Sequence, residues 1–289
     1  MIRFIIMFRH QGKNRTAKNN LQIAVVLSFV AGIVNVVGFL FLGKLTTNVT
    51  GHFALFIYDV SIMEFWKGTI YFLYIFSFLA GSFTSGWLIE TANYYKKHNI
   101  FVAPTLVECF LLFSAIVLNY FFTDFPTDIT ACILLFAMGV QNSFVTKISN
   151  SVVRTTHLTG LFTDLGIELS QWIYLKKNNL EVLLKKTKSN IKLRLFIIIF
   201  FFLGGLSGGF FFIKMEMALK TLFIPIIVLL LGLFYDDFRF VYLTKKRKYE
   251  SKIQRRKSAN TLRRQSSDNH KQKSRRYRSG RQNRRLPAQ

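Results

Sequence analysis

Residues 193–213, LRLFIIIFFFLGGLSGGFFFI, contain a single charged side chain, Arg194. A helix of about 20 mainly apolar residues crosses the roughly 30 Å hydrocarbon core of a bilayer. Five more stretches have a similar length and character: residues 21–42, 68–89, 100–122, 129–147 and 219–241. Apolar residues surround each stretch on all sides, and six such helices could not all be buried inside a soluble protein of 289 residues. The sequence therefore predicts an all-α, polytopic transmembrane bundle of six spans.

Charged residues are concentrated outside these stretches, above all at the C-terminal end. Of the 39 Lys and Arg residues, 19 lie from Arg239 onward, where Glu250 and Asp268 are the only acids. Low hydrophobicity with dense like charge predicts disorder for this tail. We therefore expect a basic N-terminal segment (1–20), a membrane domain (21–241) and a basic cytoplasmic tail (242–289).

The distribution of basic residues also predicts the orientation in the membrane. The first twenty residues contain five Lys and Arg, and the long segment after the fourth span contains six between residues 148 and 188. The loops on the other side contain only Lys44, Lys67, Lys214 and Lys220. Because Lys and Arg resist translocation, both termini are expected to face the cytoplasm.

Two polar motifs occur twice in the same order. AGIVN (31–35) is followed by TNVTG (47–51), and MGVQN (138–142) is followed by THLTG (156–160). Each copy opens a unit of three spans, about residues 21–122 and 129–241. An odd number of spans makes the second unit enter the membrane from the opposite side, which predicts the 3+3 inverted repeat of many secondary transporters.

The segments that follow the TNVTG and THLTG motifs, residues 53–61 and 161–174, are too short to span. They are expected to form re-entrant or interfacial half-helices. Gly51 and Gly160 would permit a break in the chain, and Thr50 and Thr159 would satisfy the backbone groups freed there.

At these motifs, together with Gly38-Phe39 and VRTTHLTG (153–160), the chain resembles the YoaK family of bacterial multi-pass membrane proteins, a family of domains of unknown function. The resemblance covers roughly residues 20–240 and leaves the basic tail outside. It implies a six-span fold in the bacterial plasma (inner) membrane, and it supplies no established activity.

The leading interpretation is a transporter or permease-like protein for an unidentified small solute, working by alternating access at the repeat interface. The candidate solute-binding residues are Asn35, Asn48, Thr50, Gly51, Asn142, Thr156, Thr159 and Gly160. Glu108, an acid well inside a span, is the candidate for ion coupling, because a carboxylate near the centre of the membrane must be protonated, paired or hydrated. Two plainer alternatives are hydrogen bonds of the amides between helices and a shallow Glu108 that reaches the interface.

A second interpretation is a non-transporting membrane scaffold whose basic tail binds anionic lipid or a partner. An enzyme is not expected, because the sequence lacks paired acids, a nucleophile–base pattern and nucleotide-binding motifs. The sequence leaves a homo-oligomer open.

Lys245, Lys246, Arg247 and Lys248 abut the last span and are expected to contact anionic lipid headgroups. Nucleic-acid binding is disfavoured, because Tyr249 and Tyr277 are the only aromatic residues from Lys245 onward that could stack on bases. The spacing of His157, Asp164 and Glu168 places them near one helical face. No CxxC or HExxH motif accompanies them. We therefore expect no metal site and no cofactor, and we expect Arg154 and nearby lysines to pair with the two acids.

Overall fold

The computed structural model describes residues 17–95, 100–122 and 124–235, together with Tyr242, Lys245, Lys246 and residues 249–254. The chain divides into two compact units, residues 1–236 and 237–289. The described residues of the first unit form helices and connecting loops, with no strand among them. This confirms the all-α prediction.

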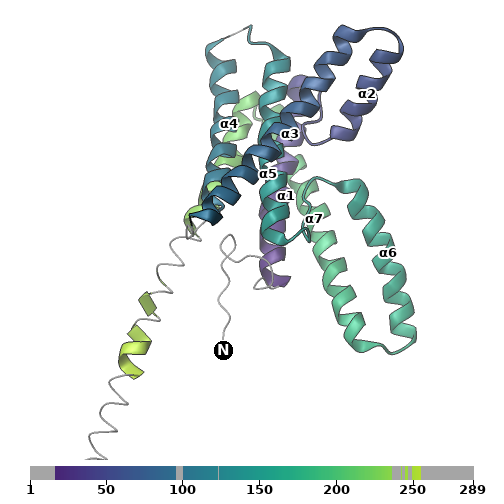
Figure 1. The fold of residues 1–289 in the computed structure, drawn as a ribbon, viewed down its shortest axis with the longest axis vertical. Helices are drawn as coiled ribbons and strands as arrows, with labels where there is room; N and C mark the ends of the chain where they lie inside the picture. The colour runs from purple at the N-terminus through teal and green to yellow at the C-terminus, as the bar shows by residue number, and fades with distance from the viewer. Residues whose placement is uncertain are drawn as a thin grey trace, which may run out of the picture. The chain divides into compact units, whose positions relative to one another are not determined.

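The described residues of the first unit form eight helical elements, and Figure 1 labels α1 to α7. They are α1 (Ala17–Leu42), α2 (Val49–Ser61), α3 (Phe65–Tyr94), α4 (Val102–Phe121), α5 (Thr127–Ser149), α6 (Leu158–Lys177), α7 (Glu181–Ile213) and a C-terminal span (Ala218–Tyr235) that begins with the 3-10 turn η2 (Ala218–Leu222). All except α2 and α6 are long and apolar enough to cross a membrane. The six predicted spans are therefore confirmed.

Two spanning helices are longer than their apolar stretches. α3 has 30 residues and α7 has 33, which corresponds to about 45 and 50 Å at 1.5 Å per residue. α7 begins twelve residues before the predicted stretch 193–213, because no Gly or Pro interrupts residues 181–192. Hydropathy detects only the apolar part of such a helix, so these longer bounds correct the prediction.

The ends of the membrane domain also differ from the sequence prediction. α1 begins at Ala17, so residues 17–20 belong to a helix and not to a separate N-terminal segment. Residues 1–16, residues 236–241 and most of the predicted tail lie outside the described residues.

α2 has 13 residues and packs against the first turns of α3, whereas α6 has 20 residues, more than the expected half-helix, and packs against the first turns of α7. Phe56 of α2 lies against Phe72 of α3, with ring centroids 5.9 Å apart. α6 is joined to α7 by ion pairs to Arg194. In Figure 1 the α2–α3 and α6–α7 pairs form helical hairpins on the right, one at each end of the bundle.

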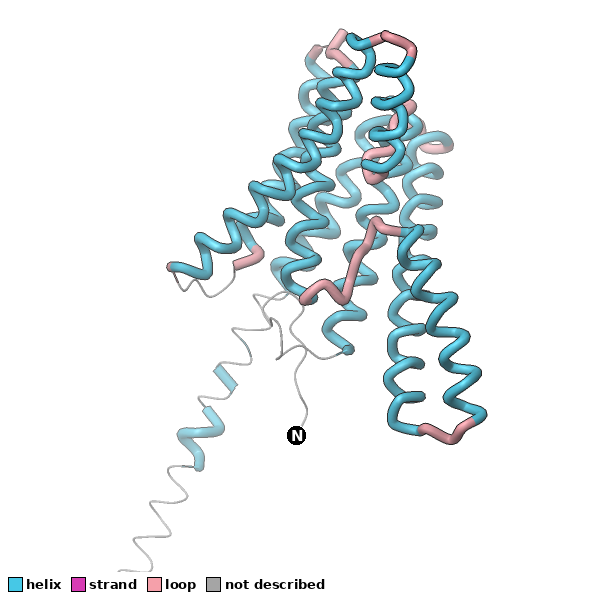
Figure 2. The backbone as a smooth tube through the Cα atoms, turned by 45° about the vertical axis from the view of Figure 1, so that its right-hand side comes forward, coloured by secondary structure: helices cyan, strands magenta, loops and turns pink. Residues whose placement is uncertain are grey.

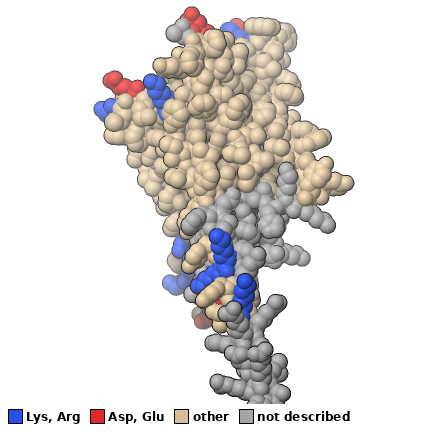
Figure 3. Space-filling model, turned by 90° about the vertical axis from the view of Figure 1, so that its left-hand side faces the viewer, with Lys and Arg blue, Asp and Glu red and all other residues tan. Residues whose placement is uncertain are grey.

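α1 and α5 form the centre of the bundle. Half of the apolar window of α1 and 61% of that of α5 are buried, compared with 22% for α3 and 28% for α7. α3 and α7 instead expose large apolar side chains such as Phe83, Trp87, Phe202 and Phe210. One face of the first unit accordingly shows a broad surface of uncharged side chains, with charges at its upper margin in Figure 3. A lipid-facing surface has this composition.

Two close helix crossings use the same arrangement of residues. Where α1 crosses α7, a methyl group on Gly32 would overlap the carbonyl oxygen of Phe201, and one on Gly204 would overlap that of Phe29. Where α5 crosses α3, a methyl group on Gly139 would overlap the carbonyl oxygen of Phe78, and one on Gly81 would overlap that of Phe136. In all four sequences the Gly follows the Phe by three residues. Small residues of this kind let helix backbones approach closely.

Candidate functional site

Asn35 of α1 binds the linker that leads to α2. Its side-chain oxygen accepts a hydrogen bond from Thr47 Oγ1 at 2.7 Å and another from the Thr47 backbone N–H at 3.3 Å. The neighbouring Thr46 hydroxyl, which is fully buried, donates to the carbonyl oxygen of Val34 at 3.3 Å. These bonds fold the linker back against α1. We call the Asn35–Thr47 pair the first lock.

Asn142 of α5 makes the matching contact in the second motif copy. Its side-chain oxygen accepts a hydrogen bond from Thr156 Oγ1 at 2.7 Å. Figure 2 shows the segment between α5 and α6 as a long loop that runs back along the bundle from the end of α5 to the start of α6. We call the Asn142–Thr156 pair the second lock.

The glycines of the two motifs lie inside continuous helices, so the expected chain breaks are wrong. Gly51 and Gly160 each occupy the third position of their helix, α2 and α6, and neither has a positive φ. A Cβ on Gly51 would lie 2.6 Å from Nδ2 of Asn48, and a Cβ on Gly160 would lie 2.7 Å from the ring of His157. Each glycine therefore makes room for the residue at the start of the helix.

The remaining predicted residues of the motifs have separate roles. Asn48 caps α2 by accepting a hydrogen bond from the Gly51 N–H at 3.0 Å, a contact typical of an N-cap. Thr50 and Thr159 are exposed, and the carbonyl oxygen of Thr159 accepts from the Thr163 hydroxyl. The two threonines thus satisfy no freed backbone groups at a break.

The two locks lie toward opposite ends of the bundle. Asn35 stands seven residues before the end of α1, and Asn142 seven residues before the end of α5. α1 and α5 run in opposite directions in Figure 1. The structure thus brings the predicted residues together within each motif copy, and it places the two copies at two separate sites.

His52 fixes the start of α2 against α3. Its Nε2 lies 2.8 Å from the carbonyl oxygen of Leu45, and its ring stands edge-on to Tyr74. Burial lowers the pKa of His52, the hydrogen bond to Leu45 opposes that shift, and the charge of Lys44 adds to it. The neutral imidazole can donate its Nε2 hydrogen to Leu45.

Glu108 of α4 lies fully buried against α5. Its Oε1 accepts a hydrogen bond from Gln141 Nε2 at 3.0 Å, and no described cation pairs with it. Glu108 Oε2 and Gln141 Oε1 have no hydrogen-bond partner among the described residues. A proton on the carboxyl group would supply the donor that this acid–amide pair lacks. This burial shows that the Glu108 side chain does not reach the surface of the bundle.

A polar hollow of about 430 Å³ reaches the second lock. We call it the Asn142 hollow. Its lining consists of polar and charged side chains: Ser82, Asn142, Ser143, Thr146, Lys147, Asn150 and Ser151. The three serines were not singled out from the sequence, because isolated serines carry no distinctive pattern.

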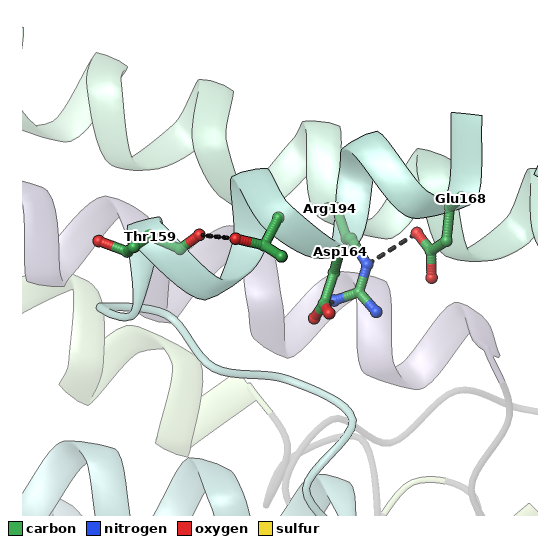
Figure 4. A network of polar contacts seen from close by, with 5 residues as sticks. Thr159, Asp164, Glu168 and Arg194 are labelled. Carbon is green, nitrogen blue, oxygen red and sulfur yellow. Dashed lines mark hydrogen bonds and ion pairs between the residues drawn. The ribbon is translucent and has the colours of Figure 1, made fainter. Parts of the chain in front are cut away.

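Arg194 of α7 joins two acids of α6. Arg194 Nε donates to Glu168 at 2.7 Å, and its NH1 lies 3.0 Å from an Asp164 oxygen. Figure 4 shows the Arg194 side chain between the two acids. The partner of these acids is therefore Arg194 and not Arg154. As the only charge in the stretch 193–213, Arg194 carried a signal that could have identified it. No group of three or more candidate metal ligands occurs in the part of the chain that the structure describes.

Two of the four tail residues predicted to contact lipid lie among the described residues. Lys245 and Lys246 are helical and exposed, whereas Arg247 and Lys248 lie outside the described residues.

Six spanning helices with polar contacts held between them define a multi-pass membrane protein. The chain belongs to the family described as "Protein of unknown function (DUF1275)", which matches residues 23–235. It is 25% identical over 155 residues to the UPF0700 transmembrane protein YoaK of Bacillus subtilis (strain 168), covering 53% of this chain and 68% of that protein. The resemblance predicted from the motifs is thereby confirmed. No solved structure matches the chain significantly.

Proposed function

We propose that the protein is a transporter or permease for a small solute, built as an inverted repeat of two three-span units. In this proposal the solute site opens alternately to the two sides of the membrane. Both chain ends face the cytoplasm of the bacterial plasma membrane, because Lys and Arg are concentrated in the first twenty residues, in the segment 148–188 and in the tail.

The observation that carries the proposal is the pair of locks on the two central helices. Each lock joins an Asn side chain to a Thr hydroxyl at 2.7 Å and holds the linker before α2 or α6, the two helices that are not candidate spans. One lies toward each end of the bundle, where an alternating-access protein needs a gate. The matched glycine crossings of α1 with α7 and of α5 with α3 support the same repeat.

Two polar features beside the second lock support passage of a solute. The Asn142 hollow gives the lock access to water from the basic end of the bundle. The adjacent residue, Gln141, binds the buried Glu108. A buried acid whose charge changes on protonation is suited to couple a proton to movement of α4 against α5.

A cysteine-labelling experiment tests alternating access without knowledge of the substrate. Cys109 and Cys132 are first replaced by Ala, and Ser143→Cys then places a thiol in the Asn142 hollow. Labelling by a membrane-impermeant maleimide is timed in inverted vesicles. Thr47→Val weakens the first lock, and Thr156→Val, its matched counterpart, weakens the second.

The two Val variants are expected to change the labelling rate in opposite directions. Each removes a hydrogen bond of about 1 kcal/mol, equivalent to roughly a fivefold change in population. Thr156→Val should open the hollow and speed labelling, and Thr47→Val should favour the form open at the other end and slow it. A solute that changes the rate saturably identifies itself as a substrate.

The scaffold alternative predicts a different result. If the bundle is held in one state, Thr47→Val alters stability but leaves labelling at Ser143→Cys unchanged within twofold. That outcome would refute alternating access and favour a scaffold whose basic tail binds anionic lipid or a partner.

A further inference from the structure

A second polar hollow lies between the start of α6 and the first half of α7, and the proposed transport mechanism makes no use of it. Its volume is about 480 Å³. We call it the Arg154 hollow. Its polar lining includes Arg154 from the α5–α6 linker, His157 and Asp164 from the start of α6, and Lys186, Asn190 and Arg194 from α7.

The charges on this lining are predominantly positive. Arg194 is bound to Asp164 and to Glu168, so these three groups together carry a single negative charge. Arg154 and Lys186 have no ion pair or hydrogen bond to any described residue. Two unpaired cations therefore face a hollow whose only acid, Asp164, is already engaged.

Uncharged donors complete the lining. The Asn190 amide and the His157 ring form no hydrogen bond with the described residues, and both can donate an N–H. Gly160 and Leu161 bring the first turn of α6 to the same hollow. The start of a helix is electrically positive and favours anions.

Topology alone does not account for this grouping. Retention of basic loops on one side of the membrane explains why Lys and Arg are frequent between residues 147 and 194, a stretch that contains nine of them and only three acids. It does not require an Arg, a Lys, an Asn and a His from three segments to line one cavity without protein partners.

We infer that the Arg154 hollow binds a phosphate-type oxyanion, supplied either by a soluble phosphate compound or by a phospholipid headgroup. Arg154 and Lys186 provide the charge, His157 and Asn190 provide hydrogen-bond donors, and the Asp164–Glu168–Arg194 group holds α6 and α7 at the spacing that forms the hollow. Arg and Lys are the side chains that most often bind phosphate oxygens in proteins.

The test uses the full chain in phosphatidylcholine nanodiscs. Inorganic phosphate is titrated by calorimetry, at constant ionic strength made up with sodium chloride. In parallel, native mass spectrometry measures the retention of phosphatidylglycerol after exchange into phosphatidylcholine. Saturable phosphate binding indicates a soluble ligand, and selective retention of phosphatidylglycerol indicates a lipid headgroup.

Two double variants separate the hollow from the general positive charge of α7. Arg154→Gln with Lys186→Gln should weaken the observed binding at least tenfold. The control, Lys185→Gln with Lys188→Gln, removes the same charge from exposed positions that flank Lys186 and do not line the hollow, and should change binding less than twofold. All four side chains are exposed, so the fold should persist, as circular dichroism can verify.

The inference is overturned if the native protein binds neither phosphate nor phosphatidylglycerol saturably. It is also overturned if the two double variants weaken binding equally, because the effect would then come from the general surface charge. Both results are independent of the labelling experiment on the locks, so failure of one proposal can be told from failure of the other.

Discussion

Replacing Gly204 with Ala tests how far the close crossing of α1 and α7 stabilises the bundle. The new methyl carbon would overlap the carbonyl oxygen of Phe29 and lie 2.8 Å from its carbonyl carbon. Carbon atoms pack at about 3.5–4.0 Å, so the helices must separate by roughly 1 Å. Overpacking of this kind costs about 1–3 kcal/mol, and Ala is favoured over Gly within a helix by roughly 0.5–1 kcal/mol. The middle of these two ranges gives a net loss of about 1 kcal/mol in the free energy of unfolding, and the upper limit is about 2.5 kcal/mol.

Gly209→Ala on the same helix provides the matched control. Its methyl carbon would lie 3.7 Å from Cγ1 of Val36, an ordinary van der Waals contact. This variant should be as stable as the native protein or more stable by up to about 1 kcal/mol. Unfolding by sodium dodecyl sulfate in mixed micelles, followed by circular dichroism, measures both. If Gly204→Ala unfolds at the same detergent fraction as Gly209→Ala, the crossing does not hold the helices as we describe.

Four other outcomes are expected. Asn48→Ala removes the cap of α2 and should lower stability by about 0.5–2 kcal/mol in the same unfolding assay. Gln141→Leu leaves the buried Glu108 without its hydrogen-bond donor and should lower stability by about 1–3 kcal/mol. Adding Glu108→Leu to this variant should restore part of the lost stability. No recovery in the double variant would contradict the pairing. Arg194→Met should lower stability by close to the lower end of about 3–5 kcal/mol, because its partner Glu168 is nearly buried. Lys147→Met breaks an exposed ion pair and should change stability by about 1 kcal/mol or less. Equal losses in the two variants would show that burial does not strengthen the Arg194 ion pair. Trypsin should remove the basic tail in inverted vesicles and spare it in intact spheroplasts, as an antibody to the tail can detect, and its loss from intact spheroplasts would overturn the proposed topology.

The sequence predicted the architecture well because the signals for it are local. A stretch of about 20 apolar residues specifies a membrane span through its own length and composition, and all six predicted stretches correspond to spanning helices. The family resemblance was also readable from short motifs. The same local signals misplaced the start of α7, because the polar residues 181–192 continue the helix beyond the apolar stretch.

Pairwise contacts at the site were less accessible to sequence reasoning. The motifs pointed to Asn35 and Asn142. Thr47 and Thr156 follow them by 12 and 14 residues, and such spacings do not indicate that the side chains form hydrogen bonds. Nor could the sequence show that Gly51 and Gly160 lie within helices, because a glycine permits a break and equally makes room for a neighbouring side chain.

What the sequence determined by itself is the class of protein, the number of spans, the family and the recurrence of the two polar motifs. Each follows from residues that are close together in the chain, so composition and spacing suffice. Only the tertiary structure decided that Glu108 pairs with Gln141, that Arg194 joins Asp164 to Glu168, and that the two locks lie toward opposite ends of the bundle. These contacts join residues on different helices, and they depend on how the helices cross, which is set by close packing at glycines such as Gly32 and Gly139.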